Sequence, residues 1–171
     1  MSARSGYIVI GVIGAGEASL KQRRLAREVG EEIGRRGAIL ASGGLGGVME
    51  AACQGAKSAA GTTLGILPGF DRAEANPYVD LAVATGLSHA RNLILVRSCD
   101  ALVAIGGGFG TLSEIAFALK LGKPVVAIDS WEVSEGIFPV SDPKEAVELA
   151  FKLVQEGKCR THSKERGNGG N

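Results

Sequence analysis

The chain has 171 residues, 45% of them hydrophobic but only 5% aromatic, which suits one domain with a core of Ala, Val, Ile and Leu. The net charge is +1, and because residues 158–171 contribute +3, residues 1–157 carry −2, which argues against nucleic-acid binding. The 2 histidines and 3 widely spaced cysteines exclude a multi-histidine metal site and favour reduced thiols in the cytoplasm, and no apolar run is long enough to span a membrane.

Apolar strand-like runs alternate along the chain with segments of helical periodicity. In chain order we expect strand 7–13, helix 19–36, strand 38–41, helix 48–60, strand 63–67, strand 81–84, helix 87–97, strand 101–105, a helix ending near 121, strand 125–128 and helix 143–156. This alternation predicts an α/β fold with a three-layer, Rossmann-like, doubly wound and mostly parallel sheet of about six to seven strands. Residues 1–157 are expected to form this single nucleotide-binding domain, followed by a disordered polar tail over 158–171.

Three glycine-rich loops, at 14–19, 42–47 and 106–111, each join the end of a predicted strand to the start of a helix. Ligands bind at this edge of open α/β sheets, where the free amides of helix N-termini attract anions and glycine lets the backbone approach them. The alternative is that these glycines serve only as tight turns. The ligand hypothesis assigns phosphate binding to Gly14, Gly16, Gly43, Gly44, Gly106, Gly107, Gly108, Gly110 and Thr111.

The same loops restrict the class of ligand. The first loop, Gly14-x-Gly16-x-x-Ser19, only approximates the dinucleotide fingerprint, and the second predicted strand ends in Ser42-Gly43 rather than in an acid that binds ribose, which disfavours NAD. The chain has no GxxxxGK[ST] motif, so ATP hydrolysis of the P-loop kind is not indicated. No metal requirement is expected.

Two charged residues fall near the same edge of the predicted sheet. Glu114 lies in the first turn of the helix after the triple glycine, where a carboxylate is either a helix-dipole partner or a general acid/base or ribose ligand. Arg91 lies near the start of helix 87–97, where it is either a solvated ion-pairing residue or an anion clamp. The neighbouring His89 is expected to be a cap or a surface residue. If the chain is an enzyme, Arg91 and Glu114 are the catalytic candidates.

Segments 88–92 and 106–114 together resemble two motifs of the LOG superfamily, whose members were long labelled "possible lysine decarboxylases". The LOG motifs are Met-His-x-Arg-Lys and Pro-Gly-Gly-x-Gly-Thr-x-x-Glu, and the resemblance spans roughly residues 7–156. The run 90–94 and the triple glycine are most similar to the branch of molybdenum cofactor carrier proteins and their bacterial relatives, which is related to the DNA-processing protein DprA. Asn92, Gly106 and Ser88 stand where the LOG motifs have Lys, Pro and Met.

The resemblance implies a homodimer or higher homo-oligomer that binds a small phosphorylated ligand and requires no cofactor. That ligand is expected to be a nucleoside monophosphate or a molybdopterin-type molecule. In LOG enzymes the motif Arg and Glu help to cleave the N-glycosidic bond of a nucleoside 5′-monophosphate, which carries those roles to Arg91 and Glu114. The first hypothesis is therefore a binding protein, with a phosphoribohydrolase and a molybdenum cofactor carrier as alternatives. DNA binding is the weakest alternative, and no lysine marks a pyridoxal phosphate decarboxylase.

Overall fold

A sheet of seven parallel strands organises the structure, a computed structural model that describes residues 6–165, with side chains described as far as residue 157. The strands are β1 (Val9–Gly14), β2 (Ile39–Ser42), β3 (Thr62–Leu67), β4 (Leu81–Ala84), β5 (Ala101–Ile105), β6 (Val125–Ile128) and β7 (Ile137–Pro139). Their order in the sheet is β4-β3-β2-β1-β5-β6-β7. The order reverses between β1 and β5, so the loops that follow these two strands flank the crevice where such sheets bind ligands.

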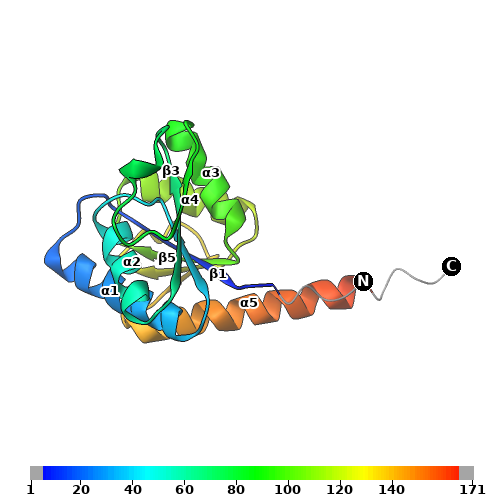
Figure 1. Cartoon of the computed structure of the whole chain (residues 1–171). Coiled ribbons are helices and arrows are strands. Elements are labelled where there is room, and N and C mark those ends of the chain that lie inside the picture. Colours follow the sequence, from blue (N-terminus) through cyan, green and yellow to red (C-terminus); the bar gives the residue numbers. More distant parts are fainter. Residues whose placement is uncertain (1–5, 166–171) are drawn as a thin grey trace.

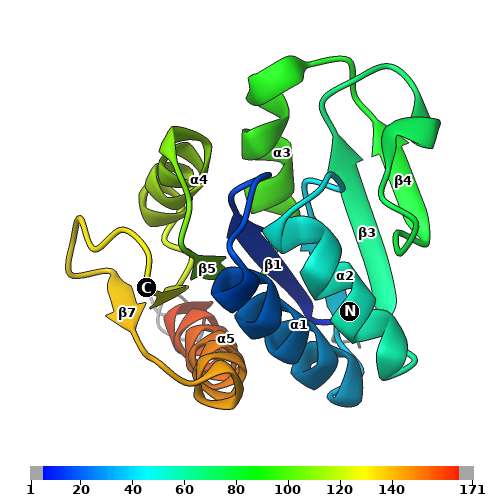
Figure 2. The same cartoon turned by 90° about the vertical axis from the view of Figure 1, so that its left-hand side faces the viewer.

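Helices cover both faces of this sheet. They are α1 (Leu20–Arg35), α2 (Val48–Ser58), α3 (Arg91–Ser98), α4 (Phe109–Lys120) and α5 (Pro143–Glu165), with short 3₁₀ turns η1 (Arg72–Glu74) and η2 (Ser88–Ala90). Figure 2 shows α1, α2 and α5 on one face and α3 and α4 on the other, in agreement with the contacts between elements. The predicted three-layer, Rossmann-like α/β fold is thus confirmed.

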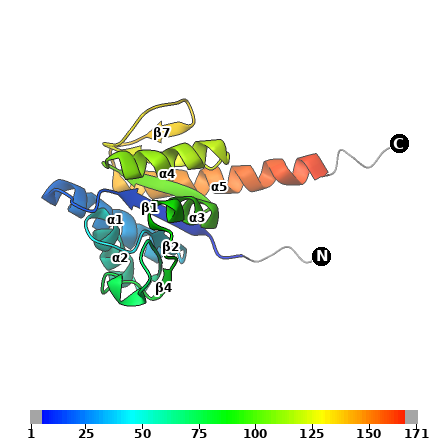
Figure 3. The same cartoon turned by 90° about the horizontal axis from the view of Figure 1, so that it is seen from above.

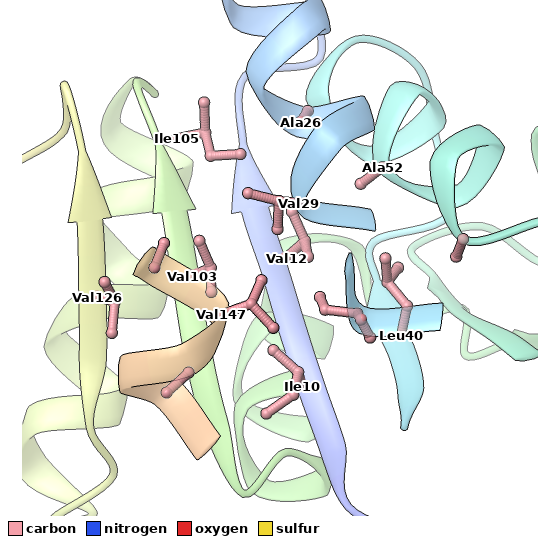
Figure 4. Close-up of a cluster of buried hydrophobic side chains, with 14 of the residues drawn as sticks. Ile10, Val12, Ala26, Val29, Leu40, Ala52, Val103, Ile105, Val126 and Val147 are labelled. Carbon is pink, nitrogen blue, oxygen red and sulfur yellow. The ribbon is translucent and has the colours of Figure 1, made fainter. Parts of the chain in front are cut away.

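Each face of the sheet has its own apolar core, because the central strands are buried on both sides. On the first face Ile10 and Val12 of β1 pack beneath α1, α2 and α5, and Figure 4 shows them beside the side chains of those helices. On the second face Ile13 and neighbouring residues pack against α3 and α4. Cys53 belongs to the first core and Cys99 to the second, and both are free thiols.

Helices α1 and α2 approach each other unusually closely at two glycines. A Cβ placed on Gly30 of α1 would lie 1.9 Å from the carbonyl oxygen of Ala52, and one on Gly55 of α2 would lie 1.9 Å from that of Arg27. Contacts this short leave no room for any side chain at either position. The close approach sets α2, and therefore the loop before it, tightly against α1.

Three features differ from the sequence-based prediction. Strand β7 was not predicted, because it has only three residues and ends in Pro139, a residue confined to the edges of sheets. The helix expected over 87–97 begins with η2, so α3 starts at Arg91. Helix α5 continues to Glu165 rather than ending near residue 156, since Gly157 does not interrupt it.

The C-terminal part of α5 extends past the rest of the molecule (Figures 1 and 3). Of the predicted tail over 158–171, residues 158–165 belong to α5, and residues 166–171 lie outside the described part of the chain. The division into a domain over 1–157 and a separate tail therefore stays a prediction. None of the helices within residues 6–165 combines the length and the apolar character that a membrane crossing requires.

Candidate functional site

The loop between β5 and α4 is shaped by consecutive glycines. Gly106 and Gly107 have φ of +55° and +109°, a backbone conformation that other residues rarely adopt. Helix α4 then begins with Gly108 at its N-cap, where no side chain caps the helix. The first amides of α4 therefore have no hydrogen bond from an N-cap side chain, and they carry the positive end of the helix dipole.

Residues of the β6 end hold this loop in place. Ser130 Oγ donates a hydrogen bond to the carbonyl oxygen of Gly106 (2.6 Å), and Trp131 Nε1 donates to that of Gly107 (3.2 Å). These bonds occupy the carbonyl oxygens that would repel an anion. Thr111 is buried with its Oγ1 close to Gly107, where a Cβ would lie 2.4 Å away. The hydroxyl of Thr111 thus lies at the turn formed by the glycines.

The N-terminus of α1 is closed by its own side chains. Ser19 Oγ accepts from the amide of Gln22 (3.2 Å), and the amide of Ser19 donates to Gln22 Oε1 (2.9 Å), which together make a capping box. Gly14 packs against Val48 and the carbonyl of Ile105 at the end of β1, whereas Gly16 is exposed. The helix's own cap therefore engages the amide of Gln22 in the first turn of α1.

The N-terminus of α2 is partly engaged by the first loop. The amide of Val48 donates to the carbonyl oxygen of Ala15 (3.0 Å), and Gly47, with φ of +66°, lies against the same carbonyl. The amide of Gly44 is taken by Ser42 Oγ (3.1 Å). Of the three predicted anion-binding loops, the one before α4 is thus the most open to a ligand.

Arg91, the first residue of α3, is buried although it carries a charge. The residue is only 8% exposed, and its Nε and Nη1 have no hydrogen-bond partner among the described residues. The guanidinium lies against the second glycine loop, because a Cβ on Gly43 would be 2.3 Å from Arg91 Nη1. Glycine at position 43 therefore leaves the room that this guanidinium occupies. Burying a guanidinium whose Nε and Nη1 make no hydrogen bond is energetically costly.

Glu114 of α4 lies in the same charged environment. It is 7% exposed, and burial raises its pKa to about 7 although the positive charge of Arg91 acts to lower it. Burial also lowers the pKa of Arg91, and the charge of Glu114 opposes that shift. The pair is thus coupled through space, with a carboxyl group that changes its charge near neutral pH.

Asn92, the residue that stands where LOG proteins have Lys, has a role that the sequence did not predict. It is buried, and its Nδ2 donates to Ser113 Oγ (3.0 Å), which in turn donates to the carbonyl oxygen of Gly110 (2.7 Å). This chain of bonds fixes α3 against the first turn of α4. The signal available in the sequence was that position 92 carries an amide side chain, where the LOG motif has the cationic side chain of Lys.

The structure thus brings Arg91 close to Gly43 and couples it to Glu114, and it places Gly106–Gly108, Gly110 and Thr111 around the start of α4. Gly14 and Gly16 belong to the neighbouring first loop, and His89 is exposed on η2. The assignment of these residues as a ligand site stays a prediction. In the part of the chain that the structure describes, no group of three or more His, Cys, Asp and Glu residues is arranged to hold a metal ion.

Comparison with known sequences gives three matches. The sequence profile of the SLOG cluster4 family matches residues 7–156. An uncharacterized protein of Archaeoglobus fulgidus is 50% identical over 138 residues, which are 81% of this chain and 91% of that protein. A cytokinin riboside 5′-monophosphate phosphoribohydrolase of Mycobacterium tuberculosis is 33% identical over 122 residues, which are 66% of this chain and 65% of that enzyme.

Solved structures with the same architecture agree with these matches. The molybdenum cofactor binding protein of Rippkaea orientalis has a TM-score of 0.82 at 38% identity, over 88% of this chain and 99% of that one. The molybdenum cofactor carrier protein of Chlamydomonas reinhardtii has a TM-score of 0.78 at 35% identity, over 88% and 99%. DprA of Streptococcus pneumoniae, at 18% identity and a TM-score of 0.67 over 84% and 61%, shares the fold alone. The resemblance predicted from the motifs is confirmed.

Proposed function

The chain belongs to the SLOG cluster4 family, and from this premise we propose that it binds a small, phosphorylated, nucleotide-like ligand at the carboxyl edge of its sheet. The phosphate lies at the N-terminus of α4, within reach of the guanidinium of Arg91. The observation that carries this proposal is the burial of Arg91 with Nε and Nη1 unpaired. A phosphate supplies both the charge and the acceptor oxygens that this guanidinium lacks.

The charge of the site supports an anionic ligand. Because the pKa of Glu114 is raised to about 7, the carboxyl group is only partly ionised at neutral pH and does not neutralise Arg91 fully. The backbone adds the uncapped amides of α4, which favour an anion further. Neither the charge of Arg91 nor the amides of α4 need a metal ion to attract an anion.

The comparisons favour a molybdopterin-type ligand, carried without chemical change. The two molybdenum cofactor proteins match this chain over 99% of their own length, whereas the phosphoribohydrolase matches over 65% of its length. Such a ligand has a phosphate and a flat ring, as a nucleotide does. The proposed role is that of a binding or carrier protein with a homo-oligomeric assembly.

A second candidate function is hydrolysis of a nucleoside 5′-monophosphate to the free base and ribose 5-phosphate. The observation that favours it is the carboxyl group of Glu114, whose pKa of about 7 suits a general acid/base. In this reaction Glu114 stabilises the developing oxocarbenium ion or activates water, and Arg91 orients the ribose phosphate. Against it, Asn92 supplies no cation and is engaged with Ser113.

Calorimetric titration with ribose 5-phosphate, AMP and GMP tests the binding proposal. We expect Arg91→Met to weaken binding of all three by about 10- to 100-fold, the value of a charge-assisted hydrogen bond lost from a buried site. Arg97→Met is the matched control, because Arg97 is an exposed residue of the same helix. Equal affinities of Arg91→Met and the wild type would show that the phosphate does not bind there.

Incubation with AMP, followed by chromatographic detection of adenine, separates the two functions. Release of adenine that disappears in Glu114→Gln supports the hydrolase. The carrier proposal instead expects AMP to be recovered intact from the wild-type protein. Release of adenine at equal rates by both proteins would remove Glu114 from the reaction.

A further inference from the structure

A hollow adjoins the glycine loop that precedes α4. It has a volume of about 390 Å³ and is lined by Gly106, Gly107, Gln22 and the four consecutive residues 129–132 that follow β6. Its lining includes neither Arg91 nor Glu114. The hollow is therefore distinct from the charged pair, yet it shares the glycine loop with the proposed phosphate site.

One residue of the lining, Trp131, belongs to an aromatic pair whose second ring, that of Phe109, lies outside the lining. Trp131 lines the hollow, is fixed by its bond to the carbonyl of Gly107, and stacks on Phe109 with ring centroids 6.2 Å apart and planes 28° from parallel. Phe109 is the first residue of α4 and is 83% exposed. An exposed aromatic ring next to a tryptophan that is held by a hydrogen bond offers a face on which a flat heterocycle stacks.

Two carboxylates also lie in the hollow. Asp129 Oδ2 accepts a hydrogen bond from Lys21 Nζ (2.6 Å), and Glu132 is exposed. Ionised carboxylates are acceptors only, so they select a ligand edge that carries donors. A ring with a ring N–H beside an exocyclic amine presents two such donors in parallel and suits a carboxylate best.

We propose that this hollow binds the flat heterocycle of the ligand whose phosphate lies at α4, and that it prefers rings with the 2-amino-4-oxopyrimidine edge. Guanine and pterins share that edge, whereas adenine lacks it. The inference rests on the proposed phosphate site, and it adds the place and the chemistry of the ring.

The position of the ligand's heterocycle also bears on whether its N-glycosidic bond can be hydrolysed. Phe109 and Glu114 are five residues apart on α4, which places their side chains about 140° apart around the helix axis. A ring stacked at Phe109 therefore holds its glycosidic bond away from the face that carries Glu114. The hollow thus favours binding of an intact ligand over cleavage.

Trp131 is the single tryptophan of the chain, so its emission reports this hollow directly. We expect GMP and a phosphorylated pterin to quench or shift the emission, and ribose 5-phosphate to bind by calorimetry without changing it. GMP is expected to bind at least about 10-fold more tightly than AMP, and the comparison of GMP with the pterin decides which of the two rings is preferred. Binding of GMP with unchanged Trp131 emission, or equal affinity for AMP and GMP, would overturn the inference.

Two variants sharpen this test. Phe109→Leu is expected to weaken GMP binding by about 5- to 100-fold, the value of stacking one base, and to leave ribose 5-phosphate binding unchanged. Phe70→Leu is the matched control, because Phe70 is 91% exposed in the loop before β4. Equal losses for both ligands in Phe109→Leu would contradict a ring site there.

Asp129→Asn removes the charge and keeps the backbone, since asparagine tolerates the φ of +48° found at this position. We expect it to abolish the preference for GMP over AMP, and an unchanged preference would overturn the role of the carboxylate. If ribose 5-phosphate fails to bind the wild-type protein at all, the phosphate site fails instead. That outcome is separate from a failure of the ring site, which leaves ribose 5-phosphate binding intact.

Discussion

Arg91 is the residue at which stability and binding are expected to oppose each other. The buried guanidinium has two nitrogen atoms without a hydrogen bond, which destabilises the unliganded protein, and an apolar side chain of similar length removes that cost. The raised pKa of Glu114 lets its carboxyl group stay protonated when the neighbouring positive charge is removed. We therefore expect Arg91→Met to leave the free energy of unfolding unchanged or to raise it by up to about 4 kcal/mol, measured by urea denaturation without ligand. Arg97→Met should lie within about 0.5 kcal/mol of the wild type. A clear loss of stability in Arg91→Met would mean that Arg91 is a structural residue.

The raised pKa of Glu114 predicts how the free energy of unfolding changes with pH. Its pKa is about 7 in the folded protein against an ordinary value of 4.5, so the folded state holds a proton that the unfolded state has released. The contribution of Glu114 to the free energy of unfolding is therefore present in full below pH 4.5 and is lost as the pH rises to about 7. The loss amounts to about 3 kcal/mol, since each pKa unit corresponds to about 1.4 kcal/mol.

Chemical denaturation at a series of pH values checks this expectation. Glu114→Gln should remove most of the decline, because the amide stays neutral throughout. Glu28→Gln, a change at an exposed position of α1, should retain the decline. An identical pH dependence in the wild type and in Glu114→Gln would show that Glu114 titrates normally.

The candidate site was predictable from the sequence only in part. Arg91 and Glu114 follow from the motifs and from their places at helix starts. The burial of Arg91 does not, because it depends on the absence of a side chain at Gly43, which another strand brings alongside. Trp131 was missed for a related reason: its contact with Gly107 joins two loops that only the neighbouring positions of β5 and β6 bring together.

At the scale of elements, the contact between α1 and α2 gives the sharpest prediction. Gly30→Ala places a methyl group 1.9 Å from the backbone carbonyl of Ala52, so one helix must shift. We expect a loss of about 3 kcal/mol or more in unfolding free energy, by thermal or urea denaturation, since overpacking against backbone cannot relax by a side-chain rotation. Gly110→Ala is the control, because a Cβ there meets nothing within 4 Å. Equal stability of the two variants would contradict the close packing.

The strands and helices themselves were largely predictable. Three strands, Leu81–Ala84, Ala101–Ile105 and Val125–Ile128, match their predicted bounds because their apolar runs are flanked by clear breaks. Strand β7 carried no comparable signal. Its three residues are paired with β6 through tertiary structure rather than through local preference.

For the whole molecule, the order of the strands predicts how the sheet opens. β1 and β5 are paired on both sides and buried on both faces, whereas β4 has β3 as its one neighbour in the sheet and exposes Leu81 and Val83. Amide hydrogen exchange should therefore be slowest in β1 and β5 and markedly faster in β4. Protection in β4 equal to that in β5 would indicate a partner that covers this edge.

The two buried cysteines allow the opening of each face of the sheet to be measured separately. Cys53 is a residue of α2 and belongs to the first core, Cys99 directly follows α3 and belongs to the second, and burial raises the pKa of both thiols, that of Cys99 to about 12. Since only an exposed thiolate reacts quickly with an alkylating reagent, each cysteine is modified when its own layer opens. With Cys159 replaced by Ser, mass spectrometry of the peptides that contain Cys53 and Cys99 would give the alkylation rate of each thiol separately. Identical rates would mean that both faces of the sheet come apart in one cooperative step.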